Sequence, residues 1–160
     1  MVVPAEQPEP RVQDTRLSDP AAQPLIDGLT ADYAKRYDDP GTEMNSADPS
    51  EFDPPRGAFV LVTVRGEVVA GGGLRPLSAE HAELKRMWTR PDQRRRGHGA
   101  RVMAPLQQRA RRLGYRELWL VTGPGQPEAV AMYESAGWSK IPNFGLYADE
   151  PRAYSYAMTL

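Results

Sequence analysis

The pattern of apolar and polar positions predicts a group of adjacent strands in the middle of the chain. Residues 57–64 (GAFVLVTV) form a dense β-branched run, and residues 68–74 (VVAGGGL) follow after a polar Arg-Gly-Glu connection, so we expect a hairpin. Residues 81–89 (HAELKRMWT) continue as a third strand. The three adjacent glycines, residues 71–73, predict a bulge or a close approach of other atoms to the backbone.

Two longer segments have the apolar spacing of a helix. In residues 20–37, the apolar stripe consists of Leu25, Ile26, Leu29, Tyr33 and Tyr37. In residues 97–113, which end before Gly114, it consists of Val102, Met103, Leu106, Ala110 and Leu113.

The remaining elements complete one mixed α/β domain. We expect strands at residues 11–17, 117–122, 138–141 and 154–160, and a short helix at residues 127–136. This order predicts one mixed sheet with helices on both faces. The domain is expected to span residues 11–160, after a flexible, Pro-rich tail at residues 1–10, with a long acidic loop at residues 38–55.

Composition removes several classes of chemistry. The 160 residues include no cysteine and two histidines, His81 and His98. We therefore expect no disulfide, no thiol nucleophile and no metal site, and direct transfer between two bound substrates if the protein is an enzyme. There is no apolar run of the roughly 18 residues that a membrane span needs, and no secretory signal in the first ten residues, so a cytoplasmic protein is expected.

Charge is segregated along the chain. The formal net charge is −1, which argues against binding of nucleic acid through bulk charge. Residues 85–116 nevertheless carry 11 basic side chains and one acidic side chain, whereas residues 1–84 carry 7 basic and 15 acidic ones. The near-zero total is a cancellation, and the local positive field around residues 85–116 suits a small polyanion.

The most informative segment, residues 94–100 (RRRGHGA), joins the strand at residues 81–89 to the second helix. A helix N-terminus leaves backbone N–H groups unpaired and carries about half a positive charge, so it favours a phosphate. Gly97 and Gly99 allow a ligand to approach the backbone closely, and the three arginines add charge for a diphosphate. The P-loop and dinucleotide patterns are missing, so we expect another pyrophosphate-bearing ligand; a solvated basic loop is the alternative.

This segment resembles the acyl-CoA signature of the Gcn5-related N-acetyltransferase (GNAT) superfamily, Q/R-x-x-G-x-G/A, through Arg94, Gly97 and Gly99. Residues 83–89 (ELKRMWT) resemble the family's fourth strand, and residues 123–138 (GPGQPEAVAMYESAGW) resemble its fourth helix with the Tyr-Glu-x-x-Gly-aromatic ending. The resemblance covers roughly the whole expected domain, including the order of its elements. It implies the GNAT fold, with one mixed, mostly antiparallel sheet whose fourth and fifth strands splay apart.

The resemblance implies acetyl-CoA as the co-substrate. The pantetheine arm would lie between the splayed strands against the backbone of the fourth strand, and the loop amides would hold the diphosphate. Gln126 stands where many relatives have an Asn that contacts the pantetheine arm, and its amide is able to form a similar bond. The residues implied in cofactor binding are Met87, Trp88, Thr89, Arg94, Arg95, Arg96, Gly97, His98, Gly99, Ala100 and Gln126.

The resemblance also implies direct acetyl transfer to a primary amine. Tyr133 matches the family's general acid, because a phenol with a pKa near 10 is protonated at neutral pH and can donate a proton to the departing thiolate. A core tyrosine is the alternative. The backbone N–H near Met87 would be the oxyanion donor. His98 lies in the phosphate loop and is not expected to be catalytic, and His81 is a weaker candidate for the acceptor side.

Glu83 is the candidate general base, with a structural ion pair to Lys85 or Arg86 as the alternative. Strict alternation predicts that the strand has two distinct faces. One would carry Glu83, Lys85, Met87 and Thr89, and the other Leu84, Arg86 and Trp88.

The resemblance places the acceptor between the first helix, the loop that follows it and the loop between the last two strands. Residues 27–56 carry a net charge of −5, which would attract a cationic amine; a solvated acidic loop is the alternative. Aromatic side chains are the candidate walls of this pocket, with ordinary packing as the alternative. They are Tyr33, Tyr37, Phe144 and Tyr147.

We therefore expect an acetyl-CoA-dependent N-acetyltransferase for a small primary amine, such as an amino acid, an amine metabolite or an antibiotic. Acetylation of a peptide or protein amine, and a CoA-binding module without catalysis, are the alternatives. A membrane is not an expected partner, because no apolar run is long enough to span one. Nucleic acid is not an expected partner either, because the arginine-rich segment lacks the interleaved aromatic residues that single-strand binders use. A homodimer is expected by analogy with the family.

Overall fold

The computed structural model describes residues 2, 3 and 8–160. Of the predicted tail, residues 1 and 4–7 lie outside the described residues, and residues 2, 3 and 8–10 belong to no helix or strand. Seven strands form one sheet within the described chain, in the order β1-β2-β3-β4-β5-β7-β6. Only the β4–β5 pair is parallel, so the predicted mixed, mostly antiparallel sheet is confirmed.

The elements follow the predicted order. The strands are β1 (Arg11–Asp14), β2 (Ala58–Val64), β3 (Glu67–Pro76), β4 (His81–Thr89), β5 (Glu117–Thr122), β6 (Ser139–Ile141) and β7 (Tyr154–Thr159). The helices are α1 (Gln23–Tyr37), α2 (His98–Arg112) and α3 (Pro127–Ser135).

Local interactions explain where α1 begins and how β2 is connected to β3. Asp19 accepts a hydrogen bond from the amide of Ala21 at 2.8 Å and caps a 3-10 turn, so α1 starts at Gln23 rather than at the predicted Pro20. The expected hairpin joins β2 to β3 through Arg65 and Gly66, whose φ angles of 52° and 78° suit the tight turn of a two-residue connection.

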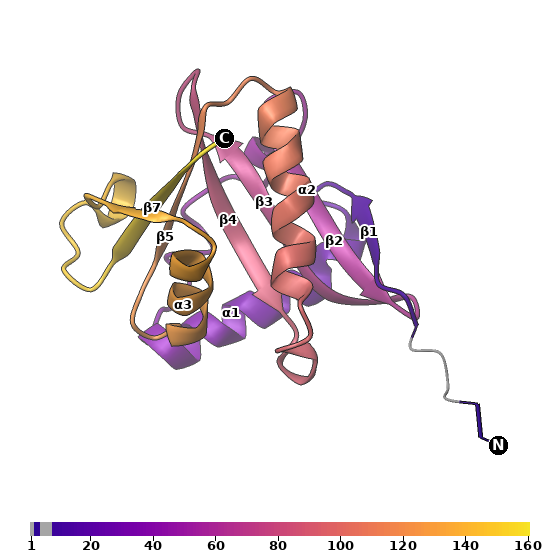
Figure 1. Cartoon of the computed structure of the whole chain (residues 1–160). Coiled ribbons are helices and arrows are strands. Elements are labelled where there is room, and N and C mark those ends of the chain that lie inside the picture. The colour runs from indigo at the N-terminus through magenta and orange to yellow at the C-terminus, as the bar shows by residue number, and fades with distance from the viewer. Residues whose placement is uncertain (1, 4–7) are drawn as a thin grey trace.

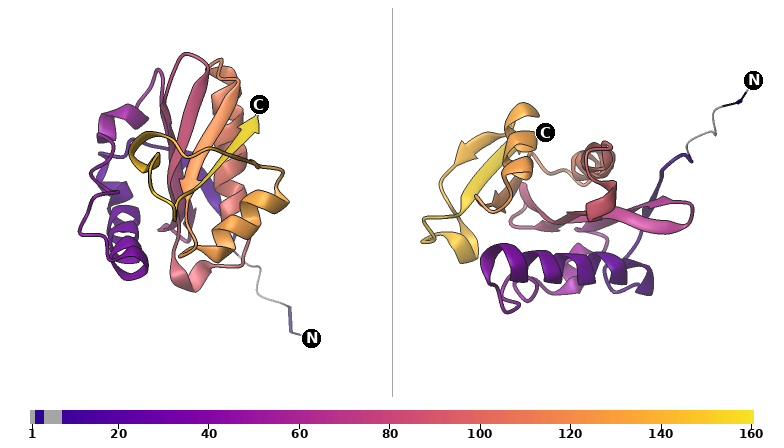
Figure 2. Two further views of the ribbon diagram at one scale, coloured as in Figure 1. Left: turned by 90° about the vertical axis from the view of Figure 1, so that its left-hand side faces the viewer. Right: turned by 90° about the horizontal axis from the view of Figure 1, so that it is seen from below.

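The helices lie on both faces of the sheet, as Figure 2 shows from below, with α1 on one face and α2 and α3 on the other. The α2 stripe is buried as expected, in a core with β2, β3, β4 and β5. A second apolar cluster fills the other face between α1 and the sheet. There α1 meets the sheet closely at Gly28, where a Cβ atom would collide with the indole ring of Trp88. The site described below lies where these layers meet at the lower ends of β4 and β5 (Figure 1).

No helix in the described part of the chain has the length and apolar character needed to cross a membrane.

Candidate active site

The β4–β5 pair separates part of the way along the sheet. Their pairing runs from His81 opposite Glu117 only to Glu83 opposite Trp119. Beyond that point residues 84–89 of β4 have no strand partner on the β5 side among the described residues, and the two strands diverge in Figure 1. The predicted splay is therefore present, and it leaves backbone donors and acceptors open for an extended ligand.

A bulge in β4 lies at the same place. Lys85 is opposite Gly73 and Trp88 is opposite Gly71, so two residues of β4 oppose the single Gly72. Arg86 has a φ of 63°, in the left-handed region. A Cβ on Gly72 would collide with the sulfur atom of Met87, which explains the small residue there and confirms the expected close approach.

Because of the bulge, the predicted assignment of the β4 side chains to the two faces of the sheet is wrong beyond Lys85. Met87 packs with Leu84 into the α2-side core, on the face opposite Glu83, whereas Trp88 belongs to the α1-side cluster. The extra residue shifts the alternation by one position, so Glu83 and Met87 do not share a face.

The predicted phosphate loop has the geometry that an anion needs. Gly97 precedes α2 with a φ of 82°, and no side chain within the described residues caps the first turn of the helix. The amides of that turn are therefore free to bind a ligand. Arg94 is tied to Asp32 of α1 at 3.0 Å, whereas Arg95 and Arg96 are exposed and have no ion-pair partner in the described chain.

His98 is a buried support of this loop. Its Nδ1 atom lies 3.2 Å from Nη1 of Arg101, and its Nε2 atom lies 3.3 Å from Oε1 of Gln93. Since Arg101 can only donate, we assign the proton to Nε2. Burial, together with the positive charges of Arg101 and Arg96, holds the pKa of His98 below its usual value of 6.5. The imidazole is neutral at neutral pH and supports the loop.

Tyr133 lies on α3, on the same side of the sheet as the phosphate loop. The start of α2 packs on α3, since a Cβ on Gly99 would lie 2.9 Å from the sulfur of Met132. The Tyr133 ring is 5 % exposed and packs edge-on against Trp138, with ring centroids 5.6 Å apart. Burial raises the pKa of Tyr133, so the phenol keeps its proton at neutral pH.

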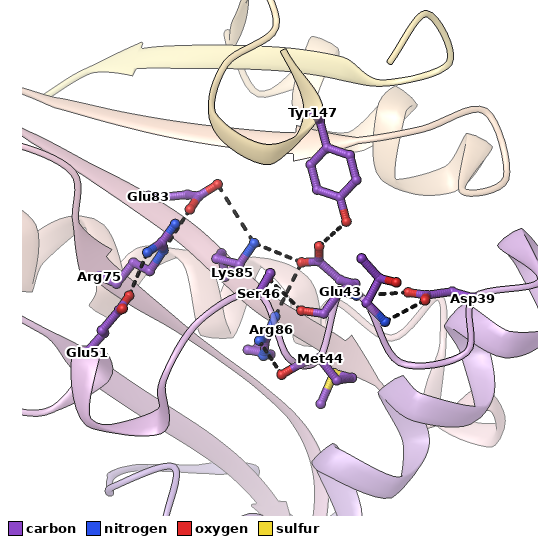
Figure 3. Close-up of polar contacts among 11 residues, drawn as sticks. Asp39, Glu43, Met44, Ser46, Glu51, Arg75, Glu83, Lys85, Arg86 and Tyr147 are labelled. Carbon is purple, nitrogen blue, oxygen red and sulfur yellow. Dashed lines mark hydrogen bonds and ion pairs between the residues drawn. The ribbon is translucent and has the colours of Figure 1, made fainter. Parts of the chain in front are cut away.

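A chain of alternating charges covers the α1-side face of β4 (Figure 3). It passes from Glu51 through Arg75, Glu83 and Lys85 to Glu43, which also contacts Arg86. The N–O distances are 2.6 Å for Glu51–Arg75, 2.8 Å for Arg75–Glu83, 3.9 Å for Glu83–Lys85, 2.9 Å for Lys85–Glu43 and 3.3 Å for Arg86–Glu43. Three carboxylates thus balance three cations in a largely buried network.

The ion pairs also show which carboxylates of the acidic segment at residues 27–56 have a cation partner. Glu43 and Glu51 are engaged in the network, Asp53 lies 3.5 Å from Arg16, and Asp32 pairs with Arg94. Four of the eight carboxylates in residues 27–56 are therefore paired with cations from other elements. The other four, Asp27, Asp38, Asp39 and Asp48, have no ion-pair partner among the described residues, so the segment keeps part of its negative charge.

Glu83 is enclosed by this network. Its side chain is 4 % exposed and lies between Arg75 and Lys85, whereas that of Glu43 is 14 % exposed and lines a cavity. Sequence reasoning missed Glu43 and Arg75. The signal that could have found them is the run of charged residues within a buried strand, Glu83, Lys85 and Arg86, each of which requires a partner.

The cavity, of about 400 Å³, lies between the end of α1, the loop after β5 and the segment between β6 and β7. Three of the four predicted aromatic residues, Tyr33, Tyr37 and Tyr147, line it; Phe144 does not, and packs against Trp119 with ring centroids 5.1 Å apart. Gln126 also lines the cavity, but its Nε2 atom donates to the hydroxyl of Tyr37 at 3.2 Å.

Two tyrosines of the cavity wall are neutral phenols. Burial raises the pKa of Tyr33, and the Glu43 carboxylate raises it further. The hydroxyl of Tyr147 donates to Oε2 of Glu43. Burial and this hydrogen bond raise the pKa of Tyr147.

His81 lies at the far end of β4 from this cavity. Its Nε2 atom is 2.7 Å from the carboxylate of Glu117, and its ring stacks on Trp119 with centroids 4.7 Å apart. No group of three or more His, Cys, Asp or Glu side chains within the described residues could hold a metal ion.

The splayed strands and the uncapped helix that follows β4 define an acyl-CoA N-acyltransferase fold. Residues 22–138 match the sequence model of the acetyltransferase (GNAT) family, and the chain belongs to this family.

Two curated relatives are similar over part of their length. The N-acetyltransferase YjgM of Escherichia coli K12 is 32% identical over 117 residues, which cover 71% of this chain and 68% of the relative. The IAA acetyltransferase of Azospirillum brasilense is 32% identical over 93 residues, which cover 57% of this chain and 61% of that protein.

Solved structures share the fold over nearly their full length. The acetyltransferase from Streptococcus agalactiae has a TM-score of 0.77 at 20% identity, covering 94% of this chain and 98% of that one. The PaiA N-acetyltransferase from Thermoplasma acidophilum, in complex with coenzyme A, has a TM-score of 0.73 at 11% identity, covering 95% and 99%.

The protonation of His98 predicts a specific acid sensitivity. Because its folded-state pKa lies below the unfolded value of 6.5, its contribution to stability is complete above pH 6.5 and declines as the pH falls toward the folded-state pKa. The free energy of unfolding, measured with urea at pH 7.5 and 5.5, should therefore fall more in the wild-type protein than in His98→Gln. Equal losses in both proteins would contradict the assignment.

Proposed function

We propose that this protein transfers an acetyl group from acetyl-CoA to a primary amine of a small molecule. The observation that carries the proposal is the small tyrosine-lined cavity beside the open stretch of β4, with the uncapped N-terminus of α2 at the end of that strand. A cavity of about 400 Å³ is in the range of small-ligand sites. A half-open pocket of this volume accommodates a small acceptor.

The residues of the open stretch fit acetyl-CoA. The backbone groups of Met87, Trp88 and Thr89 on the open β5-facing edge of β4 would hydrogen-bond the pantetheine arm, as a further strand would. The free amides around Gly97–Ala100 and the exposed Arg95 and Arg96 would hold the diphosphate. The coenzyme A bound by the similar Thermoplasma protein supports this assignment. When bound, acetyl-CoA supplies the activated carbonyl carbon.

The reaction requires three events at this site. A bond forms between the amine nitrogen and the acetyl carbon, and the carbon–sulfur bond breaks. The acceptor loses two protons in total when it starts as an ammonium, and one proton ends on the CoA sulfur. The residues of this chain therefore have to accept a proton on the acceptor side, stabilise the developing oxyanion and donate a proton to sulfur. The backbone N–H of Met87, within the bulge, is the proposed oxyanion donor.

Glu43 is the proposed proton acceptor in place of Glu83. Each carboxylate contacts two cations, but only Glu43 lines the cavity. Lys85 and Arg86 contact its Oε1 atom, and its Oε2 atom, which accepts from the neutral hydroxyl of Tyr147, is the proposed site of protonation. Lys85 connects the two carboxylates. Glu83 is thereby a positioning residue, which holds Lys85 and through it Glu43.

The proposed acid is tested by Tyr133→Phe. Removing one hydroxyl from the buried ring should lower kcat by about 100-fold, since general acid catalysis typically contributes at least that factor. The Kd for acetyl-CoA, measured by calorimetry, should change less than twofold because the phenol is not part of the phosphate loop.

The matched control is Tyr154→Phe, whose ring on β7 contacts Lys140 and should leave kcat unchanged. Full activity of the Tyr133→Phe variant would show that Tyr133 is a core residue only.

The roles of the two carboxylates are distinguished by comparing the variants Glu43→Gln and Glu83→Gln. Both substitutions keep the size of the side chain and remove one charge from the same network, so both are expected to lower the unfolding free energy by a comparable amount. Glu43→Gln should lower kcat/KM for the amine by about 100-fold with an altered pH–rate profile, and Glu83→Gln by about tenfold without altering it.

The opposite ranking, with the pH–rate profile altered only in Glu83→Gln, would return the role of general base to Glu83.

Release of free CoA thiol from acetyl-CoA in the presence of small primary amines tests the proposed function as a whole. Release that depends on the amine, with a stoichiometric amide product, is the expected result. Tight binding of acetyl-CoA without release for any amine would instead indicate a CoA-binding module. A homodimer and a cytoplasmic location stay predictions of the sequence.

A further inference from the structure

The charged groups that line the cavity are almost all engaged with other groups of the protein. Glu43 contacts Lys85, Arg86 and Tyr147. Asp39 accepts hydrogen bonds from the backbone amides of residues 41, 42 and 43 at 2.7–3.0 Å. These two carboxylates therefore have little capacity left to balance additional positive charges on a ligand.

The two cations of the cavity wall are engaged as well. Arg36 donates to the carbonyl oxygen of Gly125 at 2.9 Å and lies 3.9 Å from Glu128. Arg152 lies 3.4 Å from Glu150. An acceptor that carried a carboxylate would have to compete with the carboxylates already paired with these two arginines.

One charged side chain of the cavity wall remains to be considered. Asp38, the left-handed residue at the end of α1 with a φ of 52°, has an exposed side chain with no ion-pair or hydrogen-bond partner among the described residues. A single free carboxylate at the mouth of a cavity balances a single ammonium group, and it leaves a second one unbalanced.

Much of the rest of the wall is apolar or aromatic, and its uncharged polar side chains are Thr42, Thr122 and Gln126. The apolar and aromatic part includes the rings of Tyr33, Tyr37 and Tyr147, together with Val121, Pro124 and Ala153. Such a wall favours an apolar or flat substituent, because burial of that surface is favourable and the tyrosine faces offer aromatic contacts.

We propose that the acceptor is a monoamine with an apolar or aromatic substituent, bearing neither a carboxylate nor a second ammonium group. This inference rests on the proposed function and names the substrate class of the same site. It narrows the cationic amine that the net charge of the acidic loop suggested to one with a single ammonium group, because ion pairs within the protein neutralise part of that charge.

Two pairs of acceptors that differ in one group test the inference. 2-Phenylethylamine and L-phenylalanine differ by a carboxylate, and pentylamine and 1,5-diaminopentane differ by a second amine. With acetyl-CoA and the full chain, kcat/KM from thiol release should be at least about tenfold higher for the first member of each pair. A higher value for L-phenylalanine or for 1,5-diaminopentane would overturn the inference while the proposed function stands. Absence of release with all four amines would overturn both.

The role of Asp38 is tested by Asp38→Asn, since asparagine tolerates the left-handed backbone. We expect a two- to fivefold rise in KM for 2-phenylethylamine with an unchanged kcat, as is usual for an exposed ion pair. The matched control is Asp149→Asn, an exposed carboxylate in the segment between β6 and β7 that does not line the cavity. It should leave KM unchanged. An equal effect of both substitutions, or none for Asp38→Asn, would contradict the recognition of an ammonium group by Asp38.

Discussion

The structure depends on the separation of β4 from β5 after a short parallel contact. Three register pairs hold the strands together, and beyond Glu83 and Trp119 the pairing stops. An open strand edge in the middle of a sheet is unfavourable unless its backbone groups find other partners. At the end of this open edge the chain turns into α2, whose first amides are also uncapped. Two groups of open backbone positions, the β5-facing edge of β4 and the first turn of α2, therefore lie on either side of a short connecting segment, and the proposed cofactor site follows from them.

The alternating charge network fixes the acceptor side of the same strand. Lys85 and Arg86 lie within a buried strand, and the carboxylates that balance them come from β4 itself and from the segment between α1 and β2. Because breaking a buried ion pair is costly, the network holds this irregular segment on the sheet. The same contacts neutralise Glu43 and Glu51 of this segment. A structural requirement of the bulged strand thus determines the electrostatics of the acceptor cavity.

The sequence predicted the order of elements, the hairpin, the α2 stripe and the splay, because these depend on local periodicity and on a motif with a resemblance to a family. It did not predict the faces of β4 correctly, since one inserted residue at Arg86 shifts the alternation. It also could not pair Glu43 with Lys85 or Glu51 with Arg75, because these contacts join residues more than 20 positions apart. Net charge along a loop says nothing about the cations that fold onto it, and the sequence therefore left the role of the acidic loop open.

Amide hydrogen exchange of the full chain with and without acetyl-CoA is the most direct test of the role of the open strand edge. The account predicts slower exchange on binding in residues 84–89 and in the first turn of α2. A second cavity lies between the start of β2 and the end of α2. Binding that leaves the amides of β4 and α2 named above unchanged, and instead protects residues 56–59 and 112–113 at that cavity, would contradict the account.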